Sequence, residues 1–172
     1  DGPQKGVVAN FENALKNTKN EIIMLADQDD VWMPNKLSFL RQWFENDPNV
    51  LLLMHDMYDA SNEEIDSKIL STTSFSKRKR KNGFLYNVIY NGYYGCCMAF
   101  KRELLNKLLP FPAYDMPHDQ WISLIAEYEK KAVFIEKPLI VHRRHEKNVF
   151  TAVGIRHDRK RYDERKNGRG SY

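Results

Sequence analysis

Short apolar runs alternate with amphipathic segments through most of the 172-residue chain. Short apolar runs are typical of buried strands, and apolar side chains at helical spacing indicate helices that pack on a core. The expected strands are 21–26, 50–54, 95–100, 132–136 and 139–142, and the expected helices are 6–18, 34–45, 84–90, 103–109 and 118–131. Strands that alternate with helices predict an α/β domain in which helices flank a mostly parallel sheet.

The charge distribution separates a balanced domain from a basic tail. The chain carries 27 Lys and Arg against 23 Asp and Glu, a formal net charge of +4. All of this excess lies in residues 155–172, so residues 1–154 sum to zero, although Lys77–Lys81 is an unbroken run of cations. We therefore predict a domain over residues 1–154 and a basic C-terminal tail over residues 155–172. Either basic stretch could contact an anionic membrane, and neither has the interleaved aromatic residues that favour nucleic-acid binding.

Two features of the sequence exclude whole classes of protein. No apolar run approaches the roughly 20 residues that a membrane-spanning helix needs. The two cysteines, Cys96 and Cys97, are adjacent, which excludes a disulfide-stapled scaffold and a CxxC metal site. We expect both cysteines to act as small core residues.

Three carboxylates follow the first expected strand, at Asp27, Asp29 and Asp30. Ligands of α/β sheets bind beyond the carboxyl ends of strands, and His55 and Asp56 are expected at a second such end. Carboxylates this close repel one another unless a cation or hydrogen-bond donors compensate them, and their oxygens suit Mg²⁺ or Mn²⁺. The alternative is an acidic turn that caps the next helix. The buried strand directly before the turn favours a metal–diphosphate site.

Three further segments carry residues capable of chemistry. His118 and Asp119 stand at an expected helix start, where they could supply a general base, or Asp119 could cap the helix with Trp121 in the core. Residues 142–145 could bind metal or phosphate, or form a solvated basic strand end. Glycines beside tyrosines in residues 91–100 suggest a backbone that approaches a ligand and aromatic faces for a sugar, or a strand of small residues under a helix.

Taken in this order, these segments resemble the family 2 glycosyltransferases, which have the Rossmann-like GT-A fold. The most similar subgroup is that of the bacterial rhamnosyltransferase-like enzymes of surface-polysaccharide synthesis. Residues 22–37, with the string DQDD-x-W, look like the DXD motif of this group, and residues 95–100 are similar to its acceptor-side strand. Residues 118–121 resemble its catalytic-base segment, and residues 139–148 are similar to its terminal Tyr-Arg-x-His motif. The resemblance covers nearly all of residues 6–150.

The resemblance implies a role for each matching residue. Asp27 would contact the nucleotide, and Asp29 would hold Mg²⁺ or Mn²⁺ on the diphosphate with Asp30 in support. Asp119 would deprotonate the acceptor hydroxyl, and His145 would approach the metal. The residues that would bind the acceptor or the sugar are Trp32, Tyr94, Gly95, Cys96, His118 and Trp121. The reaction would be a direct displacement that inverts the anomeric carbon, with the metal stabilising the nucleoside diphosphate that leaves.

The chain departs from the family pattern at two points. His142 stands where the subgroup usually has Tyr. Family members also open with strands that carry the first nucleotide-contacting aspartate, and the chain begins after that point. We therefore expect a GT-A sheet that is truncated at its N-terminus, with weak nucleotide-sugar binding and little activity in this polypeptide alone.

The resemblance also implies partners and a location. The expected partners are a nucleotide-sugar donor, with rhamnose as the implied sugar, and a saccharide or lipid-linked acceptor. The expected location is the cytoplasm, at the inner face of the bacterial membrane, with peripheral contact through the basic loop or tail. The alternative function is that of a non-catalytic fragment, or a binding or scaffold module derived from such an enzyme, which would fold and be indifferent to Mn²⁺.

Overall fold

The computed structural model describes residues 6–60, 65, 72–73, 84–89, 91–112 and 116–143. The helices in this part of the chain are α1 (Val7–Lys16), α2 (Lys36–Asn46), α5 (Phe84–Ile89), the 3₁₀ turn η1 (Gly95–Cys97), α6 (Arg102–Leu108) and α7 (His118–Tyr128). The strands are β1 (Ile22–Met24), β2 (Val31–Trp32), β3 (Leu52–Ala60), β4 (Thr72–Thr73), β5 (Met98–Lys101) and β6 (Ala132–Arg143). Lys77–Lys81, His145 and residues 155–172 lie outside the described residues, and so do the predictions that rest on them.

The α/β class is confirmed, but the expectation of a mostly parallel sheet is wrong. The six strands form one sheet in the order β1-β5-β3-β6-β2, with β4 paired to β3. Among the described strands only the β3–β6 pair is parallel, and the other four pairs are antiparallel. Apolar runs report burial, not strand direction, and here β5 runs opposite to both of its neighbours.

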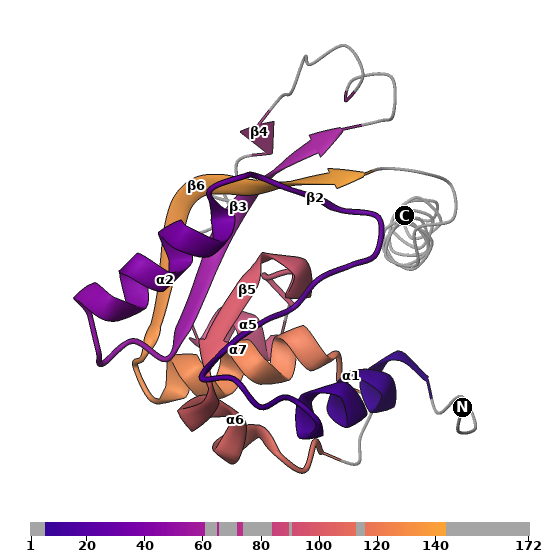
Figure 1. Ribbon diagram of the computed structural model, residues 1–172. Coiled ribbons are helices and arrows are strands. Elements are labelled where there is room, and N and C mark those ends of the chain that lie inside the picture. The colour runs from indigo at the N-terminus through magenta and orange to yellow at the C-terminus, as the bar shows by residue number, and fades with distance from the viewer. Residues whose placement is uncertain are drawn as a thin grey trace, which may run out of the picture.

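Alternate side chains of the central strands face two different helix layers. Leu52, Met98 and Phe100 pack with α1, α6 and α7, whereas Leu53 and Ala99 pack with α2. This alternation follows from the two-residue period of a strand. Figure 1 shows the result, with α2 on one side of the sheet and α6 and α7 on the other. The sheet is therefore buried on both faces, as its apolar strands predicted.

The last strand differs from its prediction. Residues 132–143 form a single strand through Pro138, where two strands flanking the proline were expected. Pro138 pairs with Asp56, and the register between β3 and β6 shifts on both sides of that pair. Proline has no N–H for the ladder, so an irregularity at this point is the usual way to keep it inside a strand.

His55 and Asp56 lie within β3 and not at its end. Both side chains are buried, and the His55 Nδ1 is 2.7 Å from the Asp56 carbonyl oxygen. The strand continues to Ala60, because the apolar run that ends at Met54 is followed by further residues that pair with β6. The prediction of a second ligand-binding strand end at His55 and Asp56 is therefore wrong.

Candidate functional site

The acidic turn links β1 to the short strand β2. Beyond Met24 the pairing with β5 ends in a hydrogen bond from the Leu25 N–H to the Met98 carbonyl, 3.3 Å long. Residues 28 and 29 then turn the chain, and Val31 and Trp32 pair with β6. Because the turn is held at both ends by strands, its carboxylates have a defined position over the sheet.

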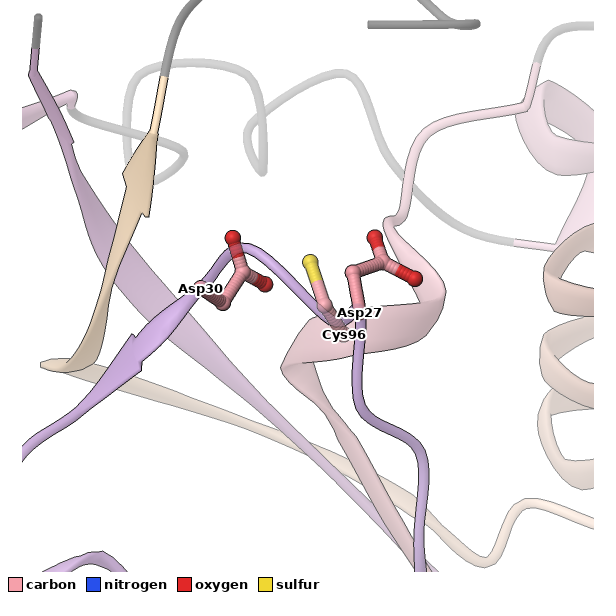
Figure 2. Close-up of side chains that lie close together, drawn as sticks. All are labelled: Asp27, Asp30 and Cys96. Carbon is pink, nitrogen blue, oxygen red and sulfur yellow. The ribbon is translucent and has the colours of Figure 1, made fainter.

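The turn brings two carboxylates to a cysteine from a distant part of the chain. The ligand atoms of Asp27, Asp30 and Cys96 all lie within 4.8 Å of one another. Figure 2 shows the two carboxylates on the turn and the Cys96 thiol rising between them from η1. The cluster thus joins the predicted donor-side motif to the predicted acceptor-side segment.

Asp30 is the member of this cluster with the least polar support. Neither of its buried carboxylate oxygens has a hydrogen-bond partner among the described residues. Burial raises the pKa of Asp30, and the negative charges of Asp27 and Asp29 add to that rise, while the nearby Cys96 thiol and His142 only partly offset it. A buried carboxylate without donors is costly unless a cation approaches it.

Asp27 is in a similar electrostatic position. Although its side chain reaches solvent, the surrounding protein desolvates it enough to raise its pKa, and the charge of Asp29 raises it further. His118 and His142 lower the pKa of Asp27, which places both imidazoles near the same turn. The turn therefore concentrates negative charge that is only partly compensated within the described chain.

The cluster at the acidic turn could hold a divalent cation. Carboxylate oxygens are suitable ligands for Mg²⁺ or Mn²⁺, those of Asp30 have no hydrogen-bond partner among the described residues, and the Cys96 sulfur adds one softer ligand. The prediction assigned the ion to Asp29 and His145, with Asp30 in support. Of these residues the structure brings Asp30 together with Asp27 and Cys96, and the assignment of the ion to Asp29 and His145 stays a prediction. Asp29 lies beside them and acts on their pKa values, and His145 is outside the described residues.

The predicted base, Asp119, lies at the start of α7 and is 8% exposed. Its Oδ1 accepts hydrogen bonds of 2.8 Å from the Asn91 side chain and from the Gln120 N–H, and the Gly95 backbone also hydrogen-bonds to the carboxylate. Burial nevertheless raises the pKa of Asp119. The bond to Gln120 lies within the first turn of α7, whose N-cap residue is Pro117, whereas the other two bonds orient the carboxylate from a different segment.

His118 presents a neutral imidazole next to Asp119. Burial lowers the pKa of His118 to about 4, and its Nε2 is a buried atom without a hydrogen-bond partner among the described residues. The ring stacks on Phe11 of α1, with centroids 3.7 Å apart and planes 15° apart. This stacking fixes the ring so that its free nitrogen is available to accept or donate one hydrogen bond.

Gly95 allows η1 to approach α7 closely. A Cβ at residue 95 would lie 2.8 Å from the His118 Nε2 and 3.7 Å from the Asp119 Cβ. Any larger residue would therefore displace the stacked His118 ring. The glycine predicted from its position beside tyrosines is needed here for packing against the base segment.

Lys36 is a site residue that the sequence reading missed. It is fully buried, its Nζ donates a 3.1 Å hydrogen bond to the Cys96 carbonyl, and the same atom lies 4.1 Å from the centroid of the Trp32 ring. Burial lowers the pKa of Lys36, while the charges of Asp30 and Asp27 favour its ammonium form. The one available signal was a lysine at the start of an amphipathic helix, six residues after Asp30.

The predicted sugar-binding aromatics divide into two groups. Trp32 and Tyr94 pack with the buried Cys96 and Cys97, and the Tyr94 ring lies 6.3 Å from the His142 ring. Trp121 instead packs on the main core, and its indole N–H donates a 3.0 Å hydrogen bond to the Leu108 carbonyl. These are the contacts of a core residue, which was the alternative interpretation of Trp121.

Comparison with known proteins agrees with this arrangement. No curated protein matches the chain at the threshold of significance. The model of the family "Glycosyl transferase family 2" matches residues 2–109, which is more than half of the chain and includes the acidic turn, Lys36 and η1. The base segment at His118 and Asp119 follows the matched residues. The chain belongs to glycosyl transferase family 2.

Proposed function

We propose that the chain is the metal-dependent, inverting glycosyltransferase domain that its family membership suggests. One observation carries the proposal: η1 joins the two halves of a transfer site. Cys96 lies with Asp27 and Asp30, and the adjacent Gly95 contacts Asp119 through its backbone. A donor diphosphate at the acidic turn and an acceptor hydroxyl at Asp119 would therefore meet above the same three-residue turn.

In this proposal Asp119 is the general base. Its hydrogen bonds from Asn91 and Gly95 hold one carboxylate orientation, and its raised pKa makes it a better proton acceptor than an exposed aspartate. The proton would pass from the acceptor hydroxyl to the carboxylate as the oxygen attacks the anomeric carbon. His118, which is neutral, would orient a sugar or diphosphate hydrogen-bonding group through Nε2.

Asp27 and Asp30 would hold the divalent cation. When bound, Mg²⁺ or Mn²⁺ supplies positive charge that stabilises the nucleoside diphosphate as it leaves. The buried Lys36 contributes a fixed positive charge below the turn and holds the Cys96 carbonyl, so it keeps η1 and the turn in register. The protein's main contribution would be to orient the donor and the acceptor.

The proposed sugar, acceptor and location follow from the resemblance of the sequence to the rhamnosyltransferase-like subgroup. The donor sugar is rhamnose or a related sugar, and the acceptor is a saccharide or a lipid-linked saccharide of a bacterial surface polysaccharide. The enzyme would act in the cytoplasm at the inner face of the membrane. No helix among the described residues is long and apolar enough to cross a bilayer, so membrane contact in this part of the chain would be peripheral.

Calorimetric titration with UDP and dTDP, with and without Mn²⁺, tests the proposal. We expect binding that requires Mn²⁺, that Asp30→Asn abolishes and that Asp119→Asn leaves intact. In the complete enzyme, Asp119→Asn should instead reduce release of nucleoside diphosphate from the sugar donor about 100-fold or more, since it removes the base. The matched control is Glu45→Gln, which removes an exposed charge on α2.

Either of two results would contradict the proposal. Nucleoside diphosphate binding that is equal with Mn²⁺ and with a chelator would indicate a binding or scaffold module. Loss of binding in Asp119→Asn, with the fold intact by circular dichroism, would show that Asp119 serves the donor and not the acceptor.

A further inference from the structure

The helix α5 has its polar and apolar sides reversed relative to an ordinary surface helix. Leu85 is 79% exposed and Ile89 is 71% exposed, while the polar Asn87 between them is fully buried. A surface helix normally turns its apolar side toward the core. The reversal means that α5 is held on the domain by polar contacts and that its apolar residues stay exposed.

Asn87 holds α5 on α7 through hydrogen bonds. Its Nδ2 donates to the Ser123 hydroxyl at 2.5 Å and lies 3.4 Å from Glu127 Oε2, both on α7. Its Oδ1 accepts a 3.3 Å hydrogen bond from the Gly92 N–H, and its backbone carbonyl accepts a 2.7 Å hydrogen bond from the Gln120 side chain. These bonds fix the rotation of α5, so the outward direction of its apolar side chains is a property of the fold.

The exposed residues form one surface with the end of α7. Tyr128 of α7 is 71% exposed, and its ring centroid lies 6.0 Å from that of Phe84. The members of this surface, named the α5 face, are Phe84, Leu85, Val88, Ile89 and Tyr128. The other large apolar residues exposed in the described chain are Val7, Val31 and Leu37, which lie on three different elements. A cluster of exposed apolar side chains indicates a binding surface, whereas single ones need no explanation.

The chemistry around the α5 face favours an anionic lipid surface as its occupant. In the sequence, the cationic run Lys77–Lys81 ends three residues before Phe84, the first residue of α5. Apolar side chains that enter the headgroup boundary, beside a basic cluster that attracts anionic headgroups, are the features of peripheral membrane binding.

The acidic side chains nearest to the α5 face are already engaged. Glu127 accepts a 3.0 Å hydrogen bond from the Tyr93 hydroxyl, and Glu129 forms a 2.7 Å ion pair with Lys107. The ion pair offsets the charge of Glu129, whereas Glu127 keeps its charge but is half-buried beside Asn87. Five consecutive cations directly before α5 in the sequence favour an anionic surface, and this is why we favour the membrane.

We propose that the α5 face is a docking surface for anionic membranes. The chain continues from α5 to Asn91, whose side chain donates the 2.8 Å hydrogen bond to Asp119. Docking at α5 would therefore place the bilayer close to the proposed base, where a lipid-linked acceptor could reach it. The delivery of a lipid-linked acceptor to Asp119 rests on the proposed function, whereas the binding of the α5 face to the membrane does not.

Co-sedimentation with vesicles rich in phosphatidylglycerol, compared with vesicles of phosphatidylcholine alone, tests the docking. We expect the chain to bind the anionic vesicles, and the double substitution Leu85→Ser with Ile89→Ser to weaken binding about tenfold or more. Both side chains point away from the core, so the variant should remain folded by circular dichroism. The matched control is Val7→Ser with Leu37→Ser, which removes two exposed apolar residues elsewhere and should bind as the parent chain does.

Three results would overturn the docking proposal. These are absence of binding to anionic vesicles, equal binding by the α5 variant and the parent, and a parent dimer that the α5 variant converts to a monomer in sedimentation. The last would identify a second copy of the chain as the occupant. The Asp30→Asn variant separates this proposal from the proposed function, because it should lose nucleoside diphosphate binding and keep vesicle binding.

Discussion

The side chains that define the site are unusual for the positions they occupy. Within the part of the chain that the structure describes, Asp30 has two buried oxygens without hydrogen-bond partners and His118 has one such nitrogen, while Lys36 is fully buried. Each of these states costs free energy in the isolated chain, because polar and charged groups lose hydration without full replacement. Such costs concentrate at sites that a ligand completes.

Asp30→Asn should therefore stabilise the metal-free chain while removing its response to metal. The amide removes a partly buried charge, and we expect a gain of about 1 kcal/mol in the free energy of unfolding, since solvent screens part of the penalty. The parent should gain about 2.7 kcal/mol at Mn²⁺ concentrations 100-fold above its Kd, and the variant should gain almost nothing. Urea denaturation with and without Mn²⁺ measures both effects.

The exposed Glu45→Gln is the control for removal of a carboxylate and should respond to Mn²⁺ as the parent does. A variant that is less stable than the parent without metal would show that Asp30 has polar support in solution. An undiminished Mn²⁺ response in Asp30→Asn would remove it from the ligand set.

At the scale of elements, the site depends on how η1 and α5 are attached to α7. The sequence predicted a strand over residues 95–100, but its first three residues form a 3₁₀ turn, closed by a 3.0 Å hydrogen bond from the Cys97 N–H to the Tyr94 carbonyl. This turn moves Cys96 toward the acidic turn and Gly95 toward Asp119. A periodic pattern of small residues contains no signal for such a change, because glycine and cysteine fit both conformations.

Asn87→Ala should detach α5 from α7. It removes the side-chain bonds to Ser123 and Gly92 and leaves the bond from the Gln120 side chain to the backbone carbonyl of residue 87. We expect a loss of about 2–3 kcal/mol in the free energy of unfolding, measured by urea denaturation. The control Asn46→Ala, at the exposed end of α2, should change this value by no more than about 0.5 kcal/mol. Equal effects of the two substitutions would mean that α5 is held by contacts other than Asn87.

Across the whole molecule, the buried titratable groups make stability depend on pH in opposing ways. His118 has a pKa of about 4 in the folded chain, below the value of about 6.5 expected when unfolded, so the unfolded state binds more protons between them. Its contribution is therefore complete above pH 6.5 and is lost as the pH falls toward 4. Asp27, Asp30 and Asp119, whose pKa values are raised, contribute with the opposite sign, because their protonation favours the folded state.

Replacing His118 by Gln separates these contributions. Gln cannot take up a proton, so the free energy of unfolding should fall less steeply in the variant than in the parent between pH 6.5 and 4. The difference between the two profiles should reach about 3 kcal/mol, measured by urea denaturation in the presence of a chelator. Parallel profiles would show that His118 titrates normally in the folded chain.

The sequence by itself determined the α/β class, most of the elements and the acidic turn, because burial and helical period are local properties of a chain. The tertiary structure alone decided which residues meet: Cys96 with Asp27 and Asp30, and Gly95 with Asp119. It also decided the direction of β5 and the rotation of α5. These depend on contacts between segments far apart in the chain, and local patterns of hydrophobicity do not encode them.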